Sequence, residues 1–147
     1  MTFEEYLDKN GELTYTNVGV SMMPLLKQHR DLFTVRQKGK KRCKAGDVVL
    51  YKRPPNRYVL HRIVEVRPDS YVILGDNCIS KEYGILDSDV LAVMTGYVRK
   101  GKSRTVNDRS YRIYTAYIMH TIPVRTAFKK LYHKARHAAK RIVYGKK

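Results

Sequence analysis

Short runs of β-branched and aromatic residues alternate with turn residues through the first two thirds of the chain. Gly, Pro, Asp and Asn fill the gaps between these runs, as is typical of short strands joined by turns. No long helical period separates the runs, so the pattern favours a mainly β fold, built as a compact barrel or sandwich. It predicts strands over residues 32–35, 47–51, 58–66, 71–74 and 90–98.

A short helix is expected before the first strand. Thr2 is a candidate N-cap, and Glu5 stands three residues later as its capping-box partner. The predicted helix covers residues 3–9 and ends near Gly11, since glycine can adopt the left-handed conformation of a helix C-terminus.

The hydrophobic period changes to a helical one after Tyr111 and is interrupted by Pro123, which predicts two helical segments that meet at the proline. Beyond it, apolar positions form one stripe while Lys and Arg fill the remaining positions, as in a basic amphipathic helix. The stripe consists of Ala127, Phe128, Leu131, Tyr132, Ala135, Ala138, Ala139 and Ile142.

The charge of the 147-residue chain is concentrated at its C-terminal end. The whole sequence has 30 Lys+Arg against 13 Asp+Glu, a formal charge of +17. Residues 1–98 have a net charge of +3, and residues 99–147 have a net charge of +14 with Asp108 as their sole acid. This asymmetry predicts a folded domain over residues 1–98 and a basic helical tail over residues 99–147.

Several classes of protein are not expected from the composition. No apolar run is long enough for a transmembrane helix, and the acidic N-terminus does not resemble a signal peptide. A cytoplasmic location is therefore expected. If the tail binds lipid, the protein would lie on the cytoplasmic face of the membrane. Cys43 and Cys78 lack CxxC spacing, so we expect reduced packing thiols and no metal site.

Four short motifs carry candidate chemistry, and they occur in the order Gly19–Pro24, Gly46–Asp47, His61–Arg62 and Gly75–Asn77. They supply a serine, a histidine and an acid, which is the set of groups that acyl transfer requires. A serine hydroxyl is a weak nucleophile until a base accepts its proton, and a third group orients that base.

In this order the motifs resemble the signal peptidase I and self-cleaving repressor superfamily of serine proteases. The nucleophile box of that family reads Gly-x-Ser-Met-x-Pro, which Gly19–Pro24 matches in full. Its second box begins Gly-Asp, its third places Lys or His before Arg, and its last is Gly-Asp-Asn. Because His61 occupies the base position, the chain is most similar to the archaeal and endoplasmic-reticulum branch, which uses His rather than Lys. The resemblance covers about residues 17–98 and depends on all four boxes together.

The resemblance implies a role for four residues. Ser21 would be the nucleophile and His61 the general base, with Asp76 as the acid that orients it. The branch has a further acid after its Gly-Asp-Asn box, a position that corresponds here to Glu82, so the orienting role is shared or substituted there. The implied reaction is endoproteolysis of a leader or signal segment of a precursor peptide, without a cofactor.

Each of these residues also has a purely structural interpretation. His61 could be a half-buried strand histidine, and Asp76 could close a β-turn through its side chain. Met22, next to the serine, is expected either in the core or along a substrate groove. At the level of function, the alternatives are a non-catalytic peptide-binding member of the fold and a nucleic-acid-binding protein that acts through its tail. The apolar stripe favours an anionic membrane surface or a partner protein over DNA as the partner of residues 110–147.

Overall fold

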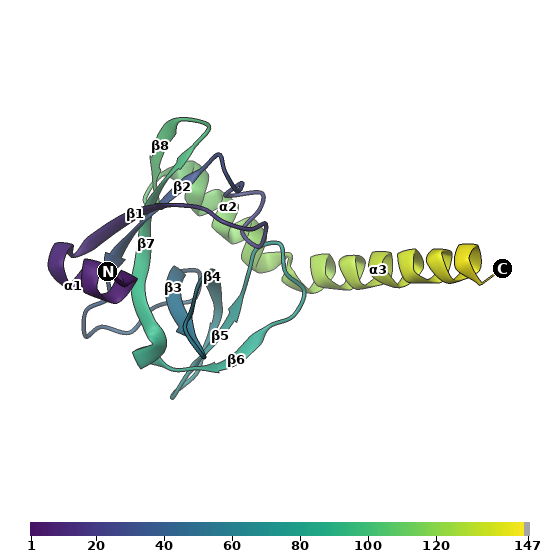
Figure 1. Ribbon diagram of the computed structural model, residues 1–147, viewed down its shortest axis with the longest axis horizontal. Coiled ribbons are helices and arrows are strands. Elements are labelled where there is room, and N and C mark those ends of the chain that lie inside the picture. The colour runs from purple at the N-terminus through teal and green to yellow at the C-terminus, as the bar shows by residue number, and fades with distance from the viewer. Residues whose placement is uncertain (146–147) are drawn as a thin grey trace.

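A computed structural model describes residues 1–145 and shows a mainly β body from which a long C-terminal helix projects (Figure 1). The described residues form one antiparallel sheet, whose strands are β1 (Glu12–Thr16), β2 (Leu32–Gln37), β3 (Val48–Arg53), β4 (Arg57–Val66), β5 (Tyr71–Leu74), β6 (Glu82–Ile85), β7 (Val90–Arg99) and β8 (Lys102–Thr105). The helices are α1 (Phe3–Asn10), α2 (Arg109–His120) and α3 (Ile122–Tyr144), with one 3₁₀ turn at Asp87–Asp89.

The strand order is β1-β2-β7-β3-β4-β5-β6. Strand β8 lies outside this order and pairs with β7. All five strands predicted from the sequence are present as β2, β3, β4, β5 and β7, and the mainly β class is confirmed. The expected barrel is wrong, since the sheet is not closed. A barrel requires its first and last strands to pair, whereas β1 pairs with β2 alone and β6 with β5 alone within residues 1–145.

The N-terminal helix forms as its capping residues predict. The Thr2 hydroxyl accepts a hydrogen bond from the Glu5 amide, and the Thr2 amide donates to the Glu5 carboxylate at 2.9 Å. Gly11 ends the helix with a φ of 74°. Leu7 is the residue of this helix that enters the core.

The basic region begins inside the folded body rather than after it. The predicted boundary at residue 98 lies within β7, and β8 pairs with β7 from Gly96 onward. From α2, Tyr111 and Ile118 are buried, and Tyr111 packs in the main core cluster. The two helical segments expected around Pro123 are α2 and α3, and only α3 leaves the body (Figure 1). Among the described residues, no helix is both long and apolar enough to cross a bilayer.

Candidate active site

Ser21 lies in a long connection between β1 and β2, here called the Ser21 loop (residues 17–31). The base of this loop is closed by Asp31, which is fully buried and accepts hydrogen bonds from the backbone amides of Lys27 at 2.8 Å and Lys100 at 3.1 Å. The neighbouring Arg30 guanidinium also donates to this carboxylate, and mainly for that reason the pKa of Asp31 is lowered to about 2. The loop is therefore fixed at its ends by a charged anchor.

The middle of the Ser21 loop is held by apolar packing. Met22, Leu25 and Leu26 are buried in the main core cluster with side chains from α1 and the sheet. Of the two interpretations of Met22, the structure therefore shows the core one. Because its neighbour is buried, the half-exposed Ser21 is held at the surface by a turn that cannot rotate freely.

The Gly75–Asn77 segment, which follows β5, packs directly against Ser21. The Asn77 amide donates a hydrogen bond to the Ser21 carbonyl oxygen at 2.8 Å, and its side chain donates to the Val20 carbonyl at 3.1 Å. A Cβ atom on Gly75 would lie 2.8 Å from the Ser21 carbonyl oxygen and 3.1 Å from His61 Cδ2. Glycine is therefore required where the serine and the histidine come together.

His61 is buried in the middle of β4, and its ring has two distinct edges. The Cδ2 edge, which neighbours Nε2, faces Gly75 and the Ser21 loop. On the other edge, Nδ1 lies 3.3 Å from the Tyr51 hydroxyl and 3.9 Å from Glu82 Oε1. The ring is thus placed between the candidate nucleophile and a carboxylate.

The hydrogen bonds on the Nδ1 side determine which ring nitrogen carries the proton. The Tyr51 hydroxyl donates its single proton to Glu82 Oε1 at 2.9 Å, so its oxygen is left to accept from His61 Nδ1–H. Burial raises the pKa of Tyr51, which keeps this proton in place at neutral pH. Neutral His61 then has an unprotonated Nε2 on the edge that faces Gly75, and a general base requires such a nitrogen.

Burial lowers the pKa of His61 below its usual 6.5. Glu82 raises that pKa, while Arg53 opposes it because its guanidinium also lies near the ring and bonds to the Glu82 carboxylate. The net effect is a lowered pKa, so His61 is uncharged at pH 7 and able to accept a proton.

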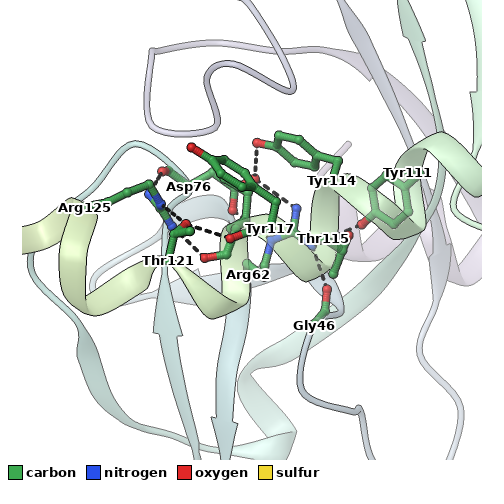
Figure 2. A network of polar contacts seen from close by, with 10 residues as sticks. Gly46, Arg62, Asp76, Tyr111, Tyr114, Thr115, Tyr117, Thr121 and Arg125 are labelled. Carbon is green, nitrogen blue, oxygen red and sulfur yellow. Dashed lines mark hydrogen bonds and ion pairs between the residues drawn. The ribbon is translucent and has the colours of Figure 1, made fainter.

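The two acids expected at the site occupy different surroundings. The carboxylate of Asp76 accepts from Arg62 Nε at 2.8 Å, from Arg62 Nη2 at 2.9 Å and from the Tyr114 hydroxyl at 2.8 Å (Figure 2). Within residues 1–145 it makes no hydrogen bond to His61. Glu82 is the acid that the structure brings within 4 Å of the ring.

Arg62 connects three of the four sequence motifs. Besides its bidentate pair with Asp76, its Nη1 donates to the Gly46 carbonyl at 2.8 Å and to Thr115 Oγ1 of α2 at 3.1 Å (Figure 2). Its side chain is completely buried. The sequence analysis did not assign a role to this arginine, although a charged residue in a strand with buried neighbours requires a partner and could have been identified on that ground.

Ser21, His61 and Glu82 line one pocket of about 660 Å³. Lys129, Tyr132 and His133 of α3 form its opposite wall. The Lys129 ammonium donates to the Asn77 backbone carbonyl at 2.9 Å, and Arg125 of the same helix donates to the Asp76 carbonyl at 2.8 Å (Figure 2). The contribution of α3 to this pocket was not predicted, because it depends on contacts across about 50 residues of sequence.

Cys78 and Ser80 also line the pocket. Burial raises the pKa of the Cys78 thiol, so this residue is not an activated thiolate.

The hydroxyl of Ser21 forms no hydrogen bond with His61 in the part of the chain that the structure describes. Catalytic hydrogen bonds often tighten only when a substrate is bound.

Scans of this chain against protein-family models, curated proteins and solved structures returned no match.

Proposed function

We propose that this protein is a serine endopeptidase of the signal-peptidase type, which removes a leader or signal segment from a precursor peptide. The observation that carries the proposal is the orientation of His61 in the pocket, with Nδ1–H directed to Tyr51 and the Nε2 edge directed to the Ser21 loop.

In the proposed reaction, Ser21 Oγ attacks the carbonyl carbon of the scissile peptide bond and its proton passes to His61 Nε2. The peptide C–N bond then breaks as His61 returns that proton to the leaving amine, which leaves an acyl-enzyme. Water attacks this ester with His61 again as the base, and the carboxylic acid product and free Ser21 are released. The lowered pKa of His61 keeps it unprotonated before each attack.

The developing oxyanion requires hydrogen-bond donors. The backbone N–H of Ser21 is the proposed donor, and within residues 1–145 no other group uses it. Relatives of the proposed type often add a hydroxyl two residues before the nucleophile, a position taken here by Gly19, which has no side chain to donate.

The two acids are assigned different tasks. Glu82 acts on His61 through the Tyr51 hydroxyl and by its charge, which stabilises the imidazolium formed during attack. Asp76 keeps the Gly75–Asn77 segment in place through Arg62, and that segment positions Ser21. On this proposal, Asp76 is a positioning residue and Glu82 is the orienting acid.

The test uses the full chain and a library of peptides prepared from whole-cell protein, with cleavage sites mapped by mass spectrometry. Ser21→Ala and His61→Ala should abolish cleavage. Ser80→Ala is the matched control, because this second serine lines the same pocket and should be dispensable. Cys78→Ser should likewise retain activity. Cleavage that persists in Ser21→Ala, or that is lost in the Ser80 variant alone, would refute the mechanism.

A further inference from the structure

The face of α3 that docks on the body is its polar face. Arg125 and Lys129 donate to backbone carbonyls of the Gly75–Asn77 segment, and Ile122 is the residue of the helix that becomes buried. An α-helix turns by about 100° per residue, so Leu131 points about 200° away from Lys129. Most of the apolar stripe of α3 is thus directed away from the body, while Tyr132 at its edge lines the pocket that contains Ser21.

This stripe is exposed over the length of the helix. Phe128, Leu131 and Ile142 are 71%, 66% and 64% exposed. The outward positions 124, 128, 131, 135, 138 and 142 follow one another at steps of four and three residues, which keeps them on one side. The C-terminal part of the helix stands clear of the body (Figure 1). Single exposed apolar residues are common in proteins, but a continuous apolar helix face requires a partner.

The charge of α3 limits what that partner can be. Between Ile122 and Gly145 there are seven Lys+Arg and no Asp or Glu. Lys130, Lys134 and Arg141 border the stripe on one side, and Arg136 borders it on the other. Two copies of this helix would place like charges side by side, which disfavours a coiled-coil dimer. The partner must be anionic and must also accept apolar side chains.

We propose that α3 lies on an anionic lipid bilayer, with the stripe inserted at the boundary between headgroups and acyl chains. Cationic side chains on both borders of an apolar stripe reach the headgroups on both sides of an interfacial helix. A nucleic acid would attract the cations but has no use for an apolar face. An acidic helix would need a groove to hold it, and α3 projects from the body as a single helix.

The proposal has a consequence for the substrate, which rests on the proposed function. Lys129, Tyr132 and His133 of α3 line the pocket that contains Ser21 and His61. A bilayer beneath the stripe places this pocket at the membrane surface, so the protease acts on precursors that are themselves bound to the membrane. Binding to vesicles is measured without any substrate, so failure of this inference and failure of the proteolytic mechanism are distinguishable.

The test is co-sedimentation of the full chain with vesicles of phosphatidylglycerol and phosphatidylcholine, compared with vesicles of phosphatidylcholine alone. Binding should require the anionic lipid and weaken as salt is added. The variant Phe128→Ser/Leu131→Ser should bind about tenfold or more weakly. Its matched control is Tyr83→Ser/Leu86→Ser, which removes apolar side chains that are 59% and 48% exposed outside α3. The control should bind like the wild type.

Circular dichroism and sedimentation velocity accompany these measurements. Both variants should keep the wild-type spectrum, since the replaced side chains are exposed, and the wild type should be monomeric without lipid. Equal binding to both kinds of vesicle, or equal loss in the two variants, overturns the proposal. A dimer that depends on Phe128 and Leu131 overturns it in favour of a second copy. RNA or DNA binding that survives their replacement, without vesicle binding, overturns it in favour of a nucleic acid.

Discussion

Replacement of Asp76 by alanine removes one half of a completely buried ion pair. The side chains of Arg62 and Asp76 are 0% and 1% exposed, and two hydrogen bonds of 2.8 Å and 2.9 Å join them. In the alanine variant the guanidinium keeps its bonds to Gly46 and Thr115, but its charge loses the only carboxylate that it contacts within residues 1–145. The Tyr114 hydroxyl loses its acceptor as well.

The expected loss of stability is large for one substitution. Breaking a buried ion pair by removal of one partner costs about 3–5 kcal/mol, and a buried hydroxyl left without an acceptor costs about 1–3 kcal/mol. These costs belong to groups in contact and do not simply add. We therefore expect Asp76→Ala to lower the free energy of unfolding by about 4 kcal/mol, a large part of the roughly 5–15 kcal/mol typical of a domain.

The assay is urea unfolding at pH 7, followed by circular dichroism. Asp69→Ala is the control, because this aspartate is exposed and its replacement should change stability by less than about 0.5 kcal/mol. Arg62→Met/Asp76→Leu should recover much of the loss, since an apolar pair leaves no buried charge. Glu82→Gln should lower activity with little change in stability. The assignment of Asp76 as a positioning residue is refuted if Asp76→Ala lowers the free energy of unfolding by less than about 1 kcal/mol, or if Glu82→Gln is equally destabilising.

Three further outcomes are expected. Arg53→Met removes a positive charge that lowers the pKa of His61, so the acid limb of kcat/KM should move to higher pH, and a shift to lower pH would contradict the site geometry. Gly75→Ala places a Cβ 2.8 Å from the carbonyl oxygen of Ser21 and should reduce kcat by about 100-fold, whereas Gly39→Ala, with open space around it, should not. Asp31 has a pKa of about 2, below its unfolded value, so it stabilises the fold above about pH 4 by about 2 kcal/mol, which is lost as the pH falls toward 2. Urea titrations across this range should show a flatter acid dependence for Asp31→Asn.

The sequence pattern predicted the strands that form the core, because their apolar content reflects their burial. Of the three strands that were not identified, β6 and β8 lack this signal, whereas β1 contributes Leu13 to the core. β8 (Lys102–Thr105) contains no apolar residue and is exposed along its length, so it forms only because β7 provides a partner. β6 contains Gly84 with a φ of 73° and has no buried residue. Whether the sheet closes could not be predicted, since closure depends on how strands distant in sequence meet.

The candidate site, like the fold, could be predicted from the sequence only in part. The linear motifs named Ser21 and His61 as candidates, and the structure places both residues in one pocket. The motifs could not assign the acid. Glu82 of β6 approaches His61 of β4 because both strands pair with β5, and Tyr51 of the neighbouring strand β3 bonds to both side chains. Contacts of this kind depend on strand order, which a single sequence does not reveal.

Adjacent residues on β4 explain why the two acids must differ. Successive side chains of a strand point to opposite faces, so His61 faces the pocket while Arg62 faces α2. Both oxygens of Asp76 are engaged by Arg62 on that second side, which leaves Glu82 as the carboxylate available to His61. The Arg62–Asp76 ion pair also connects the Ser21 loop to the helical region, since α2 contacts Arg62 and α3 contacts the Gly75–Asn77 segment. A surface that binds α3 would therefore act directly on the wall of the pocket that contains Ser21 and His61, which links the basic end of the chain to its proposed chemistry.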